Sequence, residues 1–361
     1  MKKLSEGYRW WLGQRDLTSI RRGRRHAGLA KNLEINQRTR WRTAIINVPS
    51  VLIAEQAAER DRLYKVVTSV IKMLAIPNTI VRLDFSRTNK LYPGGTLILL
   101  AYLELLLQIY PHRIRARCQP KSLAAQLLRH FGLADTLGIN VADSVPTHES
   151  VVNWRYLTGT HAEGKKIADL LKSYQEQTSV APPEGLYDVL NEALVNVRQH
   201  AYPKTTHVPE PMRRWWLFAR FNEPTDSRAG SLYIAVYDIG TGIQNSLRVK
   251  LQADEIVSKL KDEMVKWLRL GRTYTLESLL LKRAVEHPRS STGLPFRGLG
   301  LPEMRDFVLQ TSTGRLYIIS GAAQYSCSPA DKVSDSVSCN PAFPGTLILW
   351  SIPLERKELA L

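Results

Sequence analysis

Four polar side chains near the middle of the chain recur at every fourth position and could do chemistry together. They are Asp188, Glu192, Asn196 and His200. Because residues four apart drift by only ~40° on a helix of 3.6 residues per turn, these side chains form one ridge. A carboxylate, an amide oxygen and an imidazole on one ridge could provide a base, a metal ligand and a phosphate contact. The alternative is a solvated helix face, although such faces usually carry Lys–Glu pairs and this ridge has no Lys.

A second signal is a carboxylate that directly follows an alternating strand. The strand Leu232–Tyr237 runs into Asp238, Gly240 and Gly242 in the order Asp-Ile-Gly-Thr-Gly. A carboxylate at a strand end can accept a hydrogen bond from an exocyclic amine, which distinguishes adenine from guanine. Glycines after it allow a tight turn beside a ligand, where a Cβ would clash. Many strand-to-turn junctions share this pattern, so it gains meaning only together with the other signals.

Two further segments could contact a nucleotide. Arg297-Gly298-Leu299-Gly300 stands before Pro302 and Glu303, and Gly followed by an early Pro is typical of a helix start. The free N–H groups of a helix start form a site for anions such as phosphates. Gly345 and Thr346 open the final apolar strand, from which the threonine could reach a base.

The elements that must position these residues can be read from hydrophobic periodicity. In the second half, apolar residues that recur at helical spacing along one face predict a helix over 185–201. In the first half, strands alternate with helices, which predicts a small α/β sheet with right-handed crossovers. The expected strands are 44–48, 79–85 and 113–118, and the expected helices are 53–74, 96–109 and 122–131.

The order and spacing of the four chemical segments resemble the GHKL ATPase superfamily, in which they correspond to the N, G1 and G2 boxes and the final strand. The segment Asn191–Tyr202 is most similar to the bacterial anti-sigma-factor kinase branch. The resemblance implies a two-layer α/β sandwich of the Bergerat type over residues 181–361. It also implies ATP and Mg²⁺ as ligands.

The resemblance assigns a role to each residue. Glu192 would be the general base, Asn196 would give an oxygen to Mg²⁺, and Asp238, helped by Thr346, would bind the adenine amine. Residues 244–296 would form a lid over the nucleotide, and His200 would either touch phosphate or serve a structural role. The full set of expected ATP-binding residues is Asn196, His200, Asp238, Gly240, Gly242, Arg297, Gly298, Leu299, Gly300 and Thr346.

Residues 44–142 resemble a STAS domain, the fold of anti-sigma-factor antagonists. The likeness rests on Val81–Ser86, on the Pro-Gly-Gly turn at residues 93–95 with the apolar helix after it, and on Leu127–Leu133. In regulatory members of that family a serine that opens the helix is phosphorylated. Glycines stand at the equivalent place here, and Thr96 is the nearest hydroxyl.

Charge and composition limit which partners and which cellular location we expect for this protein. The chain of 361 residues has a formal charge of +17, and residues 1–43 hold 12 Lys and Arg against three acids. This basic arm either contacts nucleic acid, is simply solvated, or docks its tryptophans on the next domain. Three scattered cysteines predict neither a disulfide framework nor a zinc site, and no apolar run is long enough for a membrane span. We therefore expect a cytoplasmic protein that does not contact membranes.

The sequence thus predicts an ATP- and Mg²⁺-binding regulatory protein with slow ATPase activity. The state of its lid would control a protein partner or a second copy of the chain. The alternatives are a serine/threonine protein kinase of the anti-sigma type and an ATP-switched nucleic-acid-binding protein that uses residues 1–43. Residues 143–180 are expected to form a linker with one helix, and residues 322–344 a mobile surface loop.

Overall fold

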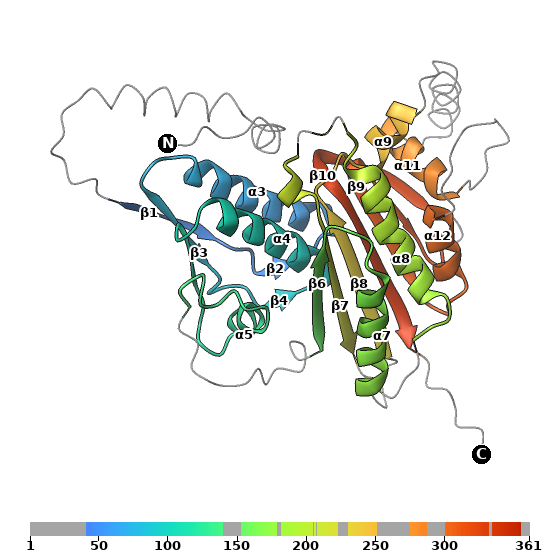
Figure 1. Ribbon diagram of the computed structural model, residues 1–361, viewed down its shortest axis with the longest axis horizontal. Coiled ribbons are helices and arrows are strands. Elements are labelled where there is room, and N and C mark those ends of the chain that lie inside the picture. Colours follow the sequence, from blue (N-terminus) through green and yellow to red (C-terminus); the bar gives the residue numbers. More distant parts are fainter. Residues whose placement is uncertain are drawn as a thin grey trace. The chain divides into compact units, whose positions relative to one another are not determined.

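The protein divides into two compact units that both combine helices and strands (Figure 1). The first comprises Met1–Asn153 with His207–Met212, and the second comprises Trp154–Thr206 with Arg213–Leu361. The expected α/β class is therefore confirmed. This computed structural model describes residues 41–139, 153–178, 182–204, 206, 208–222, 230–250, 275–286, 300–331 and 334–354.

The first unit contains a parallel three-stranded sheet in the order β1-β3-β5. Each strand lies where the periodicity predicts it, and helices connect successive strands as the crossover rule requires. The strands are β1 (Arg42–Asn47), β3 (Thr79–Asp84) and β5 (Ile114–Arg117), and the helices are α3 (Ala57–Leu74), α4 (Pro93–Ile109) and α5 (Leu123–His130). A separate parallel pair joins β2 (Val51–Leu52) to β4 (Lys90–Leu91).

Helix α4 begins in unusually close contact with the chain before α3. A Cβ on Gly95 would lie 2.5 Å from the backbone of Leu52 and of Ile53, so only glycine fits there. The Thr96 side chain is 1% exposed, because the first turn of α4 is enclosed. The hydroxyl nearest to the expected phosphorylation position is thus inaccessible in this fold.

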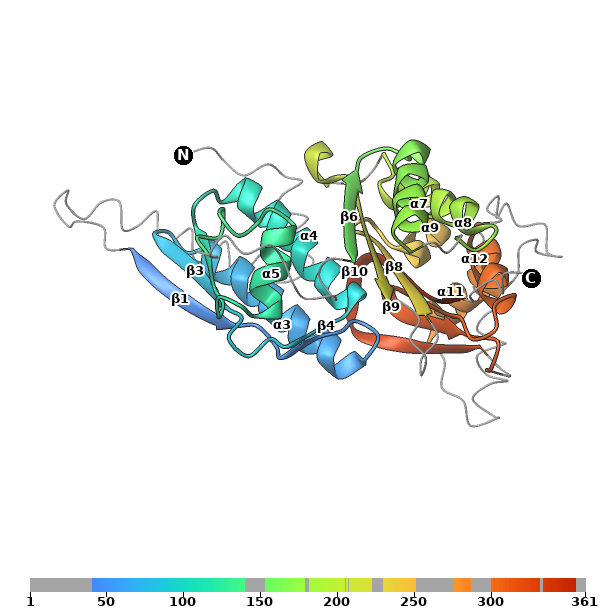
Figure 2. The same ribbon diagram turned by 90° about the horizontal axis from the view of Figure 1, so that it is seen from below.

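The second unit is a two-layer sandwich built on a five-stranded sheet. Its strand order is β6-β7-β8-β10-β9, and every neighbouring pair is antiparallel. Helices cover one face of this sheet (Figure 2). The strands are β6 (Trp154–Gly159), β7 (Trp215–Asn222), β8 (Gly230–Asp238), β9 (Arg315–Cys327) and β10 (Asp335–Leu354). The helices are α7 (Gly164–Thr178), α8 (Leu186–Asn196), α9 (Ile243–Lys250), α11 (Leu276–Glu286) and α12 (Gly300–Leu309).

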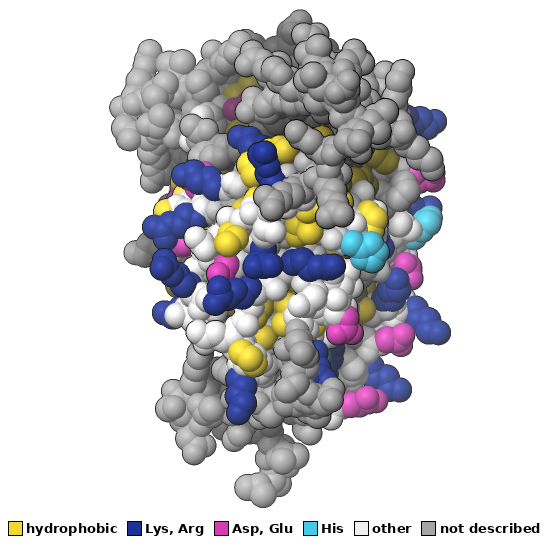
Figure 3. Space-filling model, turned by 90° about the vertical axis from the view of Figure 1, so that its left-hand side faces the viewer, with side chains coloured by type: hydrophobic (Ala, Val, Ile, Leu, Met, Phe, Trp, Pro, Cys, Tyr) yellow, Lys and Arg dark blue, Asp and Glu magenta, His cyan; other side chains and the backbone are white. Residues whose placement is uncertain are grey.

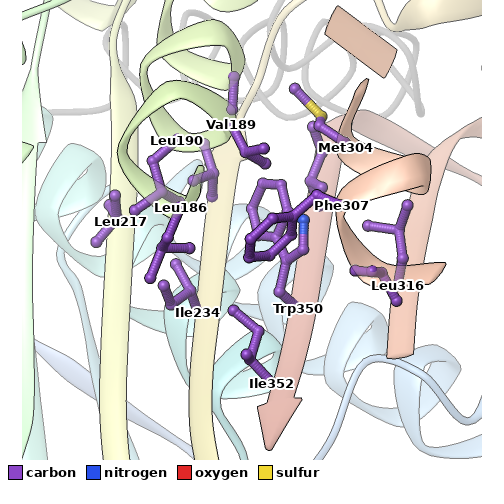
Figure 4. Close-up of a cluster of buried hydrophobic side chains, with 14 of the residues drawn as sticks. Leu186, Val189, Leu190, Leu217, Ile234, Met304, Phe307, Leu316, Trp350 and Ile352 are labelled. Carbon is purple, nitrogen blue, oxygen red and sulfur yellow. The ribbon is translucent and has the colours of Figure 1, made fainter. Parts of the chain in front are cut away.

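A single apolar core joins the helices to the sheet, and Figure 4 shows its centre. Leu190 of α8 and Met304 of α12 are fully buried there, together with Ile234 of β8 and Trp350 of β10. Burying a large apolar side chain contributes roughly 1.5–3 kcal/mol relative to exposure, so these contacts fix α8 and α12 on the sheet. The fixed helices carry the polar residues of interest.

Two expectations about connecting segments are wrong. The helix expected within residues 143–180 forms as α7, but the described part of this segment is not a linker, because β6 pairs with β7 and α7 packs beside α8 in the second unit. That unit therefore begins at Trp154 and not at residue 181. Most of the loop expected over 322–344 belongs to β9 and β10, which extend as a hairpin with two register shifts. Its polar residues alternate with the buried Ala323, Tyr325 and Cys327, and alternation is the signature of a half-buried strand.

The expected helix over 185–201 forms, but its last turn is different. The α-helical part ends at Asn196, and Val197–Ala201 continue as a π-helix, η2. Such wide turns are rare and occur frequently at functional sites. None of the helices in the described ranges is both long and apolar enough to span a membrane.

Candidate functional site

Asp238 lies at the end of β8 on the side of the sheet that faces the helices. Side chains alternate along a strand, and Ile234 and Val236 of the same strand belong to the core under α8. The Asp238 side chain is 4% exposed and accepts a hydrogen bond from the backbone N–H of Gly240 at 2.7 Å. Burial raises its pKa to about 7, despite hydrogen bonds from the backbone N–H groups of Gly240 and Thr346. The carboxyl group is therefore shielded from water, and a polar group that binds to it would stabilise its charged form.

Three glycines allow the chain to close tightly around Asp238. A Cβ on Gly345 would lie 1.8 Å from the backbone oxygen of Asp238, and a Cβ on Gly240 would lie 2.4 Å from that of Ala201. Gly242 has a φ of +82°, a conformation that disfavours L side chains. Close backbone approach thus requires Gly240 and Gly345, and a positive φ favours Gly242.

A hydroxyl pair beside Asp238 was not anticipated from the sequence. Ser320 of β9 is fully buried and lies opposite Thr346 of β10 in the ladder. The two hydroxyl oxygens are 3.1 Å apart, and Ser320 Oγ accepts the N–H of Ile243 at 2.8 Å. Only the sheet register brings Ser320 to Thr346, so no local pattern in the sequence could have identified it.

Gln244 completes this group from the first turn of α9. Its Nε2 donates to the backbone oxygen of Ser320 at 2.7 Å, and the side chain is 3% exposed. Its Oε1 is buried without a hydrogen-bond partner, and so is Oγ1 of Thr241. Buried polar atoms are nearly always hydrogen-bonded, so we expect Gln244 Oε1 and Thr241 Oγ1 to bond a ligand or a water.

Tyr202 fixes the turn after Asp238 to the end of the π-helix. Its hydroxyl donates to the backbone oxygen of Arg214 at 2.7 Å and accepts the N–H of Ile239 at 3.3 Å. Thr241 N–H also donates to the backbone oxygen of Ala201 at 2.9 Å. The loop that carries the candidate base-binding residues is therefore attached to the helix that carries Glu192 and Asn196.

Glu192 lies against the first residue of α12. A Cβ on Gly300 would be 2.2 Å from Cγ and 2.4 Å from Oε1 of Glu192, so the acid fills the space that the glycine leaves open. Burial raises the pKa of Glu192, and the negative charge of Glu303 raises it further. A carboxylate that is partly desolvated and beside a second acid is suited to take up a proton.

Asn196 ends the α-helical part of α8, four residues after Glu192. Its Nδ2 is buried without a hydrogen-bond partner. The backbone oxygen of His200, in the π-turn that follows, accepts a hydrogen bond from Ser246 of α9 at 3.3 Å. This bond connects the end of the ridge to the segment that was expected to begin the lid.

The two ends of the candidate site are separated by the length of one helix. Ala201 contacts Gly240, and Glu192 contacts Gly300, and Ala201 follows Glu192 by nine positions in sequence. At 1.5 Å per residue this separation is about 13 Å, which suits an extended nucleotide with its base at one end and its last phosphate at the other. The sequence signals therefore converge along one helix, α8 with η2.

Several expected residues lie outside the described part of the chain. They are Arg297, Gly298 and Leu299 of the expected phosphate loop, and most of the expected lid. Within that lid, α11 is described and packs on the sheet through its buried residues Leu279, Leu280, Leu281 and Val285. Residues 244–296 thus contain a helix that is docked to the core, and their role as a lid stays a prediction.

Comparisons with known proteins give no relative for this chain. No family model, curated protein or solved structure matches it significantly. The site must therefore be interpreted from its own residues. In the described ranges, no cluster of three or more His, Cys, Asp or Glu side chains is arranged to hold a metal ion.

Proposed function

We propose that the second unit binds ATP with Mg²⁺ as a GHKL-type domain, and that the protein is a regulator with slow ATPase activity. One observation carries the proposal. Segments far apart in sequence meet at the two ends of α8 with η2, where Glu192 contacts Gly300 and the Gly240 turn after Asp238 contacts Ala201. The first unit, with its parallel βαβ sheet, is proposed to be STAS-like on the same basis of residue pattern and topology.

The base end of the site fits an adenine. Ionised Asp238 would accept the exocyclic amine, and the Ser320–Thr346 hydroxyl pair offers a donor and an acceptor beside it. The orphan oxygens of Thr241 and Gln244 are polar atoms that a ligand or its waters would satisfy. A carboxylate that prefers an amine would exclude guanine, which presents a carbonyl oxygen at the same position.

The phosphate end of the site fits a triphosphate. The N-terminus of α12 provides backbone N–H groups and the positive end of the helix dipole, both of which favour anions. Asn196 would hold Mg²⁺ through its side-chain oxygen, a hard ligand of the kind that this ion prefers. Bound Mg²⁺–ATP would supply a phosphoanhydride, and Glu192 would orient and deprotonate the attacking water.

A serine/threonine protein kinase is the second candidate function. The observation that favours it is the position of Glu192, because the same carboxyl group would activate a hydroxyl of a partner as readily as it activates water. Thr96 of the first unit is 1% exposed and is therefore not the acceptor in this fold. The acceptor would be a separate protein, and transfer of labelled phosphate to added protein would distinguish this reaction from hydrolysis.

The deciding experiment compares ATP with GTP binding, with and without Mg²⁺. Wild-type protein should prefer ATP, Asp238→Asn should lose that preference, and Asn196→Ala should lose the dependence on Mg²⁺. Asp335→Asn and Asn222→Ala, which remove the same groups elsewhere in the second unit, should behave as wild type. Equal binding of ATP and GTP by the wild type would contradict the role of Asp238.

A further inference from the structure

The sheet of the first unit has one face that its helices leave uncovered. Val81, Leu83 and Ile114 are fully buried under the helices, so the alternate residues of the same strands point to the opposite face. In the ladder, Ile45 of β1, Arg82 of β3 and Arg115 of β5 form one row across the three strands. Asn47, Asp84 and Arg117 form the next row. We call these two rows the arginine face.

The arginine face has an excess of positive charge that its own residues do not neutralise. Asp84 is its one acid, and it lies 4.0 Å from Arg117. Arg115 donates to the backbone oxygen of Thr136 at 3.2 Å, and no carboxylate in the described part of the chain forms an ion pair with it. Arg82 is exposed and has no ion-pair or hydrogen-bond partner within the described residues. Figure 3 shows Lys and Arg side chains spread over the side of the molecule that bears β1, with hydrophobic ones among them.

Apolar and aromatic groups stand among these charges. The Ile45 side chain is 63% exposed in the same row as Arg82 and Arg115. Trp41, directly before β1, is 57% exposed and precedes Thr43 and Ile45 at the alternating positions of that face. An ordinary solvated sheet face carries neither feature. A flat surface with arginines for phosphates and an aromatic ring for stacking is the combination that binds single-stranded nucleic acid.

The chain that enters this face is itself strongly basic. Residues 1–40 contain 11 Lys and Arg and join β1 through Trp41. A polyanion held on the arginine face would therefore lie beside Trp41, to which this basic segment is joined. An acidic peptide could pair with the arginines, but it has no nucleic acid base to stack on the exposed indole of Trp41. These features favour a nucleic acid strand over an acidic protein.

We propose that the arginine face binds single-stranded nucleic acid, with Arg82 and Arg117 on phosphates and Trp41 stacked on a base. This site lies in the first unit, whereas the nucleotide site lies in the second, and it does not depend on the proposed ATPase activity. Duplex DNA or RNA would bind more weakly, because its bases are already stacked and cannot reach Trp41.

The test is fluorescence polarisation of the full chain with labelled oligo(dT) and oligo(U) of 12 residues, and with a duplex of the same length, over a range of salt concentrations. The double variant Arg82→Gln/Arg117→Gln should weaken single-strand binding about tenfold or more and reduce the slope of log affinity against log salt by about 1.4, at ~0.7 per phosphate. Trp41→Ala should weaken single-strand binding about tenfold and leave duplex binding almost unchanged. The control Arg62→Gln/Lys65→Gln removes two exposed charges from α3 and should have little effect.

Three results would overturn the proposal. The first is no binding of single strands by the wild type. The second is an equal loss of affinity in the arginine-face variant and in the α3 control, which would mean diffuse attraction by net charge. The third is competition by polyglutamate as effective as that by unlabelled oligonucleotide, together with no effect of Trp41→Ala. That result would assign the arginine face to an acidic protein.

Discussion

The side chain of Glu192 occupies the space that a Cβ on Gly300 would need, with Cγ only 2.2 Å from that position. The contact joins the middle of α8 to the start of α12, two helices that are more than one hundred residues apart in sequence. It places the candidate general base at the positive end of a helix dipole, where an anionic group is stabilised. Because Glu192 packs against this position, only glycine fits at residue 300.

Gly300→Ala should destabilise the protein through this contact alone. Adding a methyl group to a filled space typically costs 1–3 kcal/mol, and urea unfolding would measure it. The same substitution in the Glu192→Ala background should cost clearly less, because the obstructing side chain is gone. An equal cost in both backgrounds would show that the two residues are not in contact in solution.

Glu192→Gln should separate nucleotide binding from hydrolysis. Loss of a general base typically lowers the rate 10²- to 10⁴-fold, whereas an amide of the same shape should preserve ATP affinity. Steady-state phosphate release and a binding titration on the same sample would measure both. Glu303→Gln is the control: it should remain active, and its pH–rate profile should shift to lower pH than that of the wild type, because Glu303 raises the pKa of Glu192. A hydrolysis rate in Glu192→Gln equal to that of the wild type would rule out the base assignment.

Asp238→Asn should change how stability depends on pH. Burial raises the pKa of Asp238 to about 7 in the folded protein, against 3.8 for the ordinary carboxyl. The stabilisation that protonated Asp238 gives is fully present below pH 3.8 and is lost as the pH rises to about 7. Asparagine has no charge to bury. The free energy of unfolding of Asp238→Asn relative to that of wild type should therefore rise over this pH window by up to a few kcal/mol, at 1.36 kcal/mol per pKa unit.

Denaturant unfolding of both proteins at pH 5 and pH 8, without nucleotide, is the measurement for Asp238. A stability difference that stays constant between the two pH values would mean that Asp238 is already ionised at pH 5. Its environment would then be far more polar than the fold indicates.

Ser320→Ala should weaken ATP binding about tenfold, because it removes the hydroxyl that holds Thr346 and the N–H of Ile243. Leaving a buried donor unpaired typically costs 1–3 kcal/mol, so a loss of stability should accompany the loss of affinity. Ser328→Ala provides a matched control, since Ser328 is also buried and bonded to a backbone N–H, that of Asp331. Unchanged ATP affinity in Ser320→Ala would exclude this hydroxyl from the site.

Hydrophobic periodicity predicts most of the helices and about half of the strands. The strands of the first unit, the long helix with Glu192 and the strand before Asp238 all have hydrophobic patterns of the correct period, and core packing preserves such patterns. The final strand from Gly345 is predicted, but β9 and the first part of β10 are not, because polar residues on their exposed side resemble those of a surface loop. The strand β6 was missed because a short edge strand with mixed residues has no distinctive period.

By itself, the sequence determined the α/β class, the ridge on α8 and the glycine turns, because local spacing alone specifies them. Tertiary structure alone decided that Ser320 meets Thr346, that Glu192 packs on Gly300 and that Gln244 reaches β9. These pairs are 26, 108 and 76 residues apart in sequence. Contacts of that range are set by strand register and helix packing, which depend on the whole core and leave no trace in any short segment.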